Sequence, residues 1–252
     1  MKIQTHNGIV AFCDILGYRE ILMRNDPALV ATDVISILST AKEDVIRSHA
    51  SFLPPNVDKK IVTDKLNEIE WVTFTDSIVL LHAYPSDAHD GDRYVCWMVT
   101  IITLIYLFQH MLNKGLPIRG SISFGNYFHN NMHFAGCPIV EAYDHGQSLD
   151  LSAIALHDRA SAELMTLDAF RTGNAISAAT KNYPTPCKRG TTNTYLLYPY
   201  VPNTLITSDI KNNIERYLLD KFCAYSKSIN DDRAKGKYLN TLSFYKYVIA
   251  GK

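Results

Sequence analysis

The stretch Val10–Tyr18, VAFCDILGY, decides how the rest of the chain is interpreted. Four apolar or small residues lead into a single aspartate, Asp14, and Ile-Leu-Gly follows it. The apolar run before Gly17 predicts a short buried strand over Val10–Ile15. Burying a carboxylate in a strand costs desolvation free energy. Asp14 is therefore either the cap of a turn or a functional ligand at the end of the strand.

The composition gives no sign of a nucleic-acid-binding, membrane-surface, cysteine-ligated metal or secreted protein. The chain has 252 residues, which is enough for one large domain or two small ones. Its 25 basic and 25 acidic residues leave no net charge, so nothing global favours nucleic acid or an anionic membrane as a partner. The five cysteines are scattered without metal-site spacing, and the N-terminus lacks the apolar core of a signal peptide. We expect a cytoplasmic protein with free thiols.

One segment raises the question of a membrane span. Val95–Leu112 carries no charge over 18 residues, the lower limit for a helix that crosses a bilayer. Two threonines, a glutamine and a histidine dilute it, and no second segment of this kind exists. This pattern favours a buried core helix.

Strand and helix patterns alternate along the chain. Residues 25–49 predict an amphipathic helix capped by Asn25 or Asp26. Its apolar stripe consists of Leu29, Val30, Val34, Ile37, Leu38, Ala41 and Val45. Two β-rich runs, Glu70–Phe74 and Ser77–Leu81, predict a hairpin around Thr75-Asp76.

The second half of the chain continues this alternation. The expected elements are a strand over 118–128, a short helix stopped by Gly146, a strand over 152–156, a helix over 157–167, a last clear strand over 194–200, and helices from about Thr207. Ser86–Arg93 is expected to be a solvated acidic loop. Together the elements predict an α+β sandwich with a mainly antiparallel sheet and helices on one face.

Asp14 and Asp76 are the first candidates for chemistry. If the hairpin neighbours the first strand, both carboxylates meet at one edge of the sheet. Hard cations such as Mg²⁺ take carboxylate oxygens and leave positions open for phosphates. Two such ions can clamp an in-line displacement at phosphorus. The alternative is a turn cap at Asp14 and an exposed hairpin tip at Asp76.

Four motifs in the expected order resemble class III nucleotidyl cyclases over roughly residues 9–198. FCDILGYREIL (12–22) is similar to the first metal motif of that family, and TFTDSIVLL (73–81) to its second metal hairpin. LPIRGSISFGNYF (116–128) and KRGTTNTYLL (188–197) are similar to two later signatures. The resemblance implies the fold of that catalytic domain over residues 1–200, a ferredoxin-like antiparallel-rich sheet with helices packed on it. Residues 201–252 would form a C-terminal helical extension packed on the same domain, either bracing a dimer or covering the sheet.

The resemblance also implies the metal site. Asp14 and Asp76 would hold two divalent ions, Mn²⁺ or Mg²⁺, with the backbone carbonyl of Ile15 as a further ligand. Lys188 and Arg189 would contact the outer phosphates of a nucleoside triphosphate; the alternative is an exposed basic turn. Backbone amides would cradle the triphosphate, and these would belong to Ile15, Leu16, Gly17 and Tyr18.

Three positions depart from the purine-specific cyclases. Where those enzymes use a lysine to read the purine edge, this chain has Val72. Where they use an asparagine and an arginine to stabilise the transition state, GCPIVEAYD (136–144) has Val140 and Asp144. The motifs RGSISFG (119–125) and EAY (141–143) resemble instead the bacterial pyrimidine cyclases of Pycsar antiphage defence.

Some residues keep two interpretations. Arg119 is either a replacement cation that contacts the base carbonyl or the α-phosphate, or a strand-edge arginine in a surface ion pair. Trp71 either stacks on a pyrimidine or is a core side chain. Glu141 either reaches the cleft or lies on a helix surface. His129 and His133 have the spacing of a metal pair, but their context favours a turn between strands.

The predicted protein is a homodimeric uridylate cyclase with its active sites at the dimer interface. It would convert UTP to cyclic UMP and pyrophosphate, and the product would signal to a separate effector with a cyclic-nucleotide-binding domain. One alternative is a cytidylate cyclase that makes cyclic CMP. The alternative from another class is a catalytically silent cyclase-fold module that binds a nucleotide or dimerises. The preference for uridine rests on prevalence in the family and not on a residue.

Overall fold

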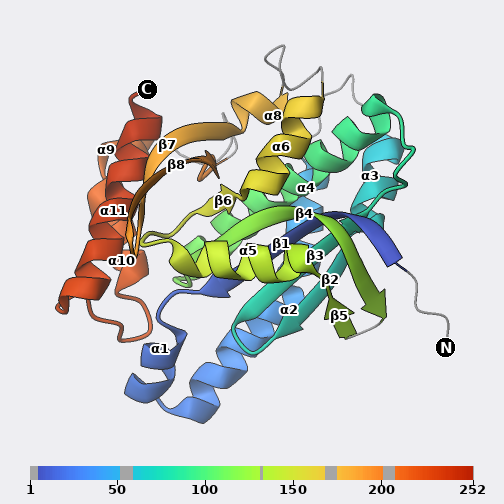
Figure 1. Ribbon diagram of the computed structural model, residues 1–252. Coiled ribbons are helices and arrows are strands. Elements are labelled where there is room, and N and C mark those ends of the chain that lie inside the picture. The colour runs from blue at the N-terminus through green and yellow to red at the C-terminus, as the bar shows by residue number, and fades with distance from the viewer. Residues whose placement is uncertain (1–4, 52–58, 131–132, 168–174, 201–207, 252) are drawn as a thin grey trace.

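The computed structural model describes residues 5–51, 59–130, 133–167, 175–200 and 208–251 (Figure 1). The strands are β1 (Thr5–Ile15), β2 (Glu70–Phe74), β3 (Ser77–Ala83), β4 (Ile118–Asn130), β5 (His133–Ala135), β6 (Ile154–Leu156), β7 (Thr180–Cys187) and β8 (Gly190–Leu197). The helices are α1 (Tyr18–Arg24), α2 (Pro27–Ser51), α3 (Lys59–Glu68), α4 (Asp90–Asn113), α5 (Cys137–Ser148), α6 (Asp158–Thr166), α8 (Ala175–Ala178), α9 (Ser208–Asn212), α10 (Ile214–Phe222) and α11 (Asp232–Ile249).

The described strands form one sheet in the order β2-β3-β1-β4-β6-β8-β7, and β5 pairs with β4 beside this path. β1 pairs antiparallel with β3 and with β4, while β4 and β6 are parallel. The expected antiparallel-rich α+β fold is therefore confirmed, and the expected hairpin is β2–β3. The centre of the sheet is the triplet β3-β1-β4, which ends at Asp14.

Helices cover both faces of the sheet, so the expectation of helices on one face was wrong. Alternate β1 residues pack on opposite sides: Ile9, Ala11 and Cys13 join the core formed with α2 and α4, whereas Val10 and Phe12 lie under α5. Figure 1 shows α5 lying across the near face, with α2 and α4 behind the sheet. α5 alone is too small to bury that face completely.

The long apolar segment is a core helix. α4 is the one described helix whose length and composition would allow it to cross a membrane, and 78% of its most apolar window is buried inside the protein. It starts at Asp90, so the predicted loop over Ser86–Arg93 is half helix. Asp90 and Asp92 lie in its first turn, where carboxylates are favoured by the helix dipole.

The C-terminal helices cover the sheet as well as the main core. Tyr238, Leu242 and Tyr245 of α11 join the large core, whereas Phe244 and Val248 pack in a second cluster with residues of β6, β7 and β8. Of the two expected roles for this extension, covering the sheet is observed. Bracing a dimer stays a prediction.

Three local predictions need correction. β7 was missed because Pro184 and Pro186 break the usual strand pattern, but β7 is the edge strand, where prolines are tolerated. Gly146 does not stop α5, which continues to Ser148. A Cβ there would lie 3.2 Å from the Gly120 backbone, so Gly146 allows α5 to pack closely on β4.

Leu29 of the predicted apolar stripe is 69% exposed. Asp26, not Asn25, caps α2 by accepting the Ala28 amide at 2.9 Å.

Two buried histidines couple the stability of the fold to pH. Burial lowers the pKa of His49 and of His82 to about 4. For His82 the nearby Lys65 lowers the pKa further, and His82 Nε2 lies 3.9 Å from Glu68 Oε2. The unfolded chain takes up these protons near the ordinary value of 6.5, which the folded protein resists. Stability is therefore highest above that value and is lost as the pH falls toward 4.

We expect each histidine to lower the free energy of unfolding by up to about 1.4 kcal/mol per pH unit across this interval. Urea unfolding followed by circular dichroism from about pH 7 to about pH 5 measures the slope. His49→Leu removes one titrating group from apolar surroundings and should reduce this slope by up to about 1.4 kcal/mol per pH unit. An unchanged slope in that variant would contradict the assignment.

Candidate functional site

Asp14 lies at the end of β1 on the face toward α5. Its neighbours across the sheet are Ser77 of β3 and Arg119 of β4. It shares the face of Phe12 and Val10, which pack in the apolar cluster beneath α5. The Asp14 side chain is 12% exposed and therefore sits in a site where an unpaired charge would be costly.

Arg119 provides the partner of this buried carboxylate. Its Nε lies 3.1 Å from Asp14 Oδ1, and its Nη2 lies 3.3 Å from Asp14 Oδ2. The same guanidinium donates through Nη1 to the carbonyls of Gln147 at 3.2 Å and Leu149 at 3.3 Å. Nη2 also donates to the Gln147 side-chain oxygen.

This geometry narrows the two interpretations of Arg119. The ion pair exists, but it is buried and not on the surface. The guanidinium is directed at Asp14 and at the end of α5, so it holds the carboxylate in place. A contact from Arg119 to substrate stays a prediction, because it would require some of these bonds to be exchanged.

Asp76 is joined to the end of β1 through the backbone. The Ile15 amide donates to the Asp76 carbonyl at 3.0 Å, and the residue after Asp76 pairs with Asp14. Thr75 adopts the left-handed region at φ 49, which turns the chain between β2 and β3. The Asp76 carboxylate accepts the Thr75 hydroxyl at 3.0 Å and is partly exposed. The sheet thus brings both aspartates to one end of neighbouring strands.

The turn between β1 and α1 offers fewer amides than expected. The Ile15 amide is used by Asp76, and the Leu16 amide donates to the Pro117 carbonyl at 2.8 Å. The predicted cradle for a triphosphate is therefore limited to Gly17 and Tyr18. Gly17 has φ 77, a left-handed conformation that favours glycine, and a Cβ there would lie 3.3 Å from the Lys227 side chain.

The donor set at this end of the sheet fits hard divalent ions. Asp14, Asp76 and the Ile15 carbonyl supply oxygens, which Mg²⁺ and Mn²⁺ prefer. No described group of three or more His, Cys, Asp or Glu side chains could hold a metal. Mg²⁺ is commonly bound through one or two carboxylates with phosphates and waters completing its shell. A carboxylate has about four lone-pair sites, so Asp14 retains acceptor capacity beside Arg119.

Trp71 does not belong to this site. It pairs with Leu80, and its side chain packs against the core on the helical face with α2 and α4. Asp14 faces the opposite side of the sheet, so the expectation that Trp71 stacks on a base was wrong, and the alternative of a core side chain is observed. Val72 does point to the face of Asp14, where it is 3% exposed among apolar neighbours.

Lys188 and Arg189 form the two-residue turn of the β7–β8 hairpin, and both are exposed. The Lys188 amide donates to the Ser148 carbonyl at 2.8 Å, which ties the turn to the end of α5. Burial and then the nearby Arg119 lower the pKa of Lys188, so cationic charge is concentrated here. The two side chains line a cavity of about 820 Å³ together with residues of α5 and α6.

A polar network that sequence reasoning did not find lines the same cavity. Glu141 pairs with Arg159 at 3.0 Å and accepts the Ser123 hydroxyl at 2.8 Å. His145 Nδ1 lies 2.8 Å from the Ser121 hydroxyl oxygen, and burial lowers its pKa. Glu141 therefore reaches the cavity as well as β4. Ser121 and Ser123 are two residues apart on β4, the spacing that places both on one face of a strand. This alternation is the signal in the sequence that indicates a polar patch on this face.

The remaining predicted positions are spread over the same face. Val140 is 58% exposed on α5, and Asp144 lines the cavity of about 820 Å³. Neither offers the cation that the purine-specific enzymes place on this helix. His129 lies in β4 and His133 in β5, the antiparallel neighbour of β4. Residues 131–132 lie outside the described residues.

The fold is that of a nucleotidyl cyclase catalytic domain. The catalytic core of a rhodopsin-guanylyl cyclase with converted specificity, in complex with ATPαS, is similar with a TM-score of 0.52 and 13% identity, covering 78% of this chain and 98% of that one. The guanylyl cyclase Cya2 gives a TM-score of 0.41 at 13% identity, over 82% of this chain and 99% of that one, which is too low to support an argument. No protein-family profile and no curated protein sequence matches the chain. Because the sequence identity to the rhodopsin-guanylyl cyclase core is 13%, that similarity establishes the fold alone.

The buried pair predicts strong energetic coupling between Asp14 and Arg119. Asp14→Asn leaves the guanidinium buried without its anion, which should cost about 3–5 kcal/mol of unfolding free energy. Adding Arg119→Gln should cost less than the sum of the single changes, with a coupling energy of about 1–3 kcal/mol. Urea unfolding of the four proteins measures this cycle. The exposed pair Lys246–Glu215, at 3.5 Å, is the matched control and should couple by about 0–1 kcal/mol. Additivity at Asp14 and Arg119 would contradict the role of the pair.

Proposed function

We propose that the protein is a class III nucleotidyl cyclase that acts on a pyrimidine nucleoside triphosphate with two divalent ions. The observation that carries the proposal is the meeting of Asp14 and Asp76 at one end of the sheet, beside the left-handed turn at Gly17. The cyclase fold of the chain supports it independently of these residues.

The reaction would be an intramolecular displacement. The ribose 3′-oxygen forms a bond to the α-phosphorus, the bond from that phosphorus to the bridging oxygen breaks, pyrophosphate leaves, and the hydroxyl proton passes to solvent. Two bound Mg²⁺ or Mn²⁺ ions would supply charge neutralisation and lower the pKa of that hydroxyl. Asp14, Asp76 and the Ile15 carbonyl would hold these ions, and Arg119 would fix the orientation of Asp14. Catalysis would rest mainly on positioning and electrostatics.

The absence of purine-reading groups supports a pyrimidine substrate. Val72 presents no hydrogen-bonding group and is buried among apolar residues. Val140 and Asp144 replace the polar pair that the purine enzymes carry on this helix. Between the pyrimidines we favour UTP, giving cyclic UMP, over CTP, because uridylate cyclases prevail in the Pycsar group that the sequence resembles. The cyclic nucleotide would act in the cytoplasm as an antiphage signal to a separate effector.

A homodimer with interfacial active sites is part of this proposal. The sheet face under α5 exposes large apolar side chains, which often mark an interaction surface. These are Phe74 of β2 and Val140 and Tyr143 of α5. They surround an aromatic cluster in which Phe12 contacts Phe74 and Tyr143. A second copy seated on this face would bring its own α5 toward Asp14.

A silent nucleotide-binding or dimerisation module is the second candidate. Two observations favour it. Arg119 already occupies part of the hydrogen-bonding capacity of Asp14. In addition, α5 lacks the cation that stabilises the transition state in the purine-specific enzymes. Both candidates predict nucleotide binding, and they differ in turnover.

Incubation of the pure protein with Mn²⁺ and each ribonucleoside triphosphate separates the two candidates. We expect pyrophosphate and a cyclic product from UTP, less or none from CTP, and none from ATP or GTP. Asp76→Asn should lower kcat at least about 100-fold because it removes an anion that neutralises charge in the transition state. The exposed acid Asp220 on α10 lies outside the site, and Asp220→Asn should leave kcat unchanged. Chromatography of the products with a pyrophosphate assay measures both.

The possible results of this assay are distinct. No turnover with any of the four substrates would favour the silent module. Cyclisation of ATP or GTP alone would overturn the inference from Val72. Full activity in Asp76→Asn would remove that residue from the metal site.

The dimer proposal predicts a matched pair of surface changes. Val140→Glu puts a charge into the exposed apolar face under α5 and should weaken dimerisation at least about tenfold. Leu29 of α2 is 69% exposed on the other side of the sheet, and Leu29→Glu should leave the dimer intact. Sedimentation equilibrium measures the masses. A wild-type protein that is active as a monomer at all concentrations would contradict an active site at the dimer interface.

A further inference from the structure

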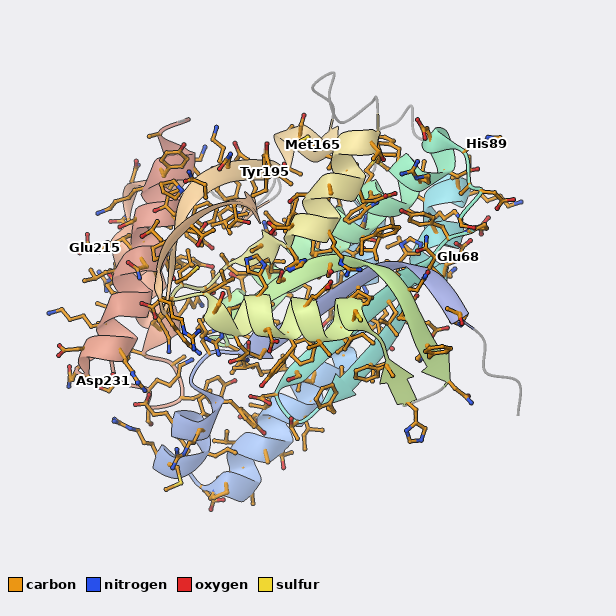
Figure 2. The ribbon with its side chains drawn as sticks, in the orientation of Figure 1. Glu68, His89, Met165, Tyr195, Glu215 and Asp231 are labelled. Atoms are coloured by element: carbon orange, nitrogen blue, oxygen red, sulfur yellow. The ribbon has the colours of Figure 1, made fainter. Side chains whose placement is uncertain are left out.

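A second cavity, of about 530 Å³, lies between the β1–α1 turn and the C-terminal helices. Leu16 and Gly17 form one wall, and residues 227–237 form the opposite wall. Figure 2 labels Asp231 at the start of α11, and Asp231 lines this cavity opposite α1. None of the four motifs that resemble cyclases supplies the second wall.

Positive charge predominates in this cavity. Four cations line it: Arg19, Lys227, Arg233 and Lys237. The lining acids Glu20 and Asp231 are already engaged. Glu20 pairs with Arg24 at 2.9 Å and accepts the Ser228 amide, while Asp231 caps α11 by accepting the Ala234 amide at 2.9 Å.

Three of these four cations, Arg19, Arg233 and Lys237, are available to a ligand, whereas Lys227 is already engaged. Lys227 is 8% exposed and donates to the Gly115 carbonyl at 2.8 Å, and burial lowers its pKa to about 8. Within the described part of the chain, the side chains of Arg19, Arg233 and Lys237 make no hydrogen bond and no ion pair. An anion in the cavity would therefore not have to displace an existing ion pair of these three side chains.

The C-terminal wall is fixed to α1 by hydrogen bonds. Asn25, at the end of α1, donates to the Tyr225 carbonyl at 2.7 Å, and the Ser226 hydroxyl donates to Asn25 Oδ1 at 3.1 Å. Tyr225 and Ser226 both have positive φ, at 56 and 57. Such a conformation persists in two consecutive non-glycine residues only where the surroundings hold it. The wall is thus built in one position relative to Gly17.

The cavity adjoins the proposed metal site. After burial, the nearby Arg119 is the main cause that lowers the pKa of Lys237, and Lys237 in turn contributes to the lowered pKa of Lys188. The cations of α11 and of the β7–β8 turn therefore lie around the same Asp14–Arg119 pair. Gly17, three residues after Asp14, and Pro117, two residues before Arg119, line the cavity together with Lys237.

We infer that this cavity takes the outer phosphates of the nucleoside triphosphate, and that Arg233 and Lys237 of the C-terminal extension bind them. The inference rests on the proposed function for the identity of the ligand. It assigns to α11 a direct part in substrate binding and adds two phosphate-binding residues to Lys188 and Arg189.

Binding of inorganic tripolyphosphate to the full chain, measured by calorimetry with a chelator present, tests the cavity without catalysis. Arg233→Gln combined with Lys237→Gln should weaken tripolyphosphate binding at least about tenfold, the loss expected from removing charge-assisted hydrogen bonds. Lys235→Gln is the matched control, because Lys235 is exposed on the same turn of α11 and does not line the cavity. It should leave the affinity unchanged. Lys237→Arg keeps the charge and should retain most of the binding, even if the double variant folds poorly.

Nucleoside triphosphate must compete with tripolyphosphate for the cavity, and the double variant should raise KM for the triphosphate about tenfold. Unchanged tripolyphosphate affinity in the double variant, or simultaneous binding of both ligands, would overturn the inference. Competition and charge dependence in a chain that cyclises none of the four substrates would overturn the proposed function and leave the inference standing. Normal turnover with unchanged KM in the double variant would overturn the inference about the cavity and leave the proposed function standing.

Discussion

The buried ion pair between Asp14 and Arg119 is the interaction on which the geometry of the site depends. The two residues occupy paired positions on neighbouring strands, and Arg119 also holds the carbonyls of Gln147 and Leu149 at the end of α5. The pair thus joins β1, β4 and α5 at one point. Such a pair adds little net stability over apolar packing, but losing one partner is costly because the other charge stays buried. It therefore specifies where these elements end relative to one another more than it strengthens the fold.

This pair also sets the electrostatic terms on which a metal ion can bind. A divalent ion at Asp14 would lie beside a guanidinium, and only an anionic substrate can balance that concentration of positive charge. Burial, and then repulsion from the nearby Arg119, lowers the pKa values of Lys188 and Lys237, so an anionic substrate would balance these cations too. Metal, triphosphate and the basic side chains are therefore expected to bind as one interdependent set.

The sequence predicted the elements whose pattern is local. The β2–β3 hairpin, the core helix α4 and the strand before Asp14 follow from residue periodicity, and the strand pairing that joins Asp14 and Asp76 followed from the resemblance. The two interpretations of Trp71 stayed open in the sequence because a strand alternates between faces, and only the register shows that Val72 and Asp14 share one face while Trp71 faces the core. Pro184 and Pro186 hid β7 because edge position is a property of the whole sheet. Arg233 and Lys237 have no local signal, since their place beside Gly17 depends on contacts between distant segments.

The hydrogen bond from Asn25 to Tyr225 spans 200 positions of the chain. During synthesis, the β1–α1 turn leaves the ribosome long before the segment that closes it. Until that segment arrives, Asn25 lacks its partner and the cavity beside Gly17 has one wall. A nascent chain can therefore fold its central strands without completing the phosphate pocket, and truncated products of translation would lack the pocket altogether. A fragment with both aspartates in place would thus still lack part of the proposed phosphate site.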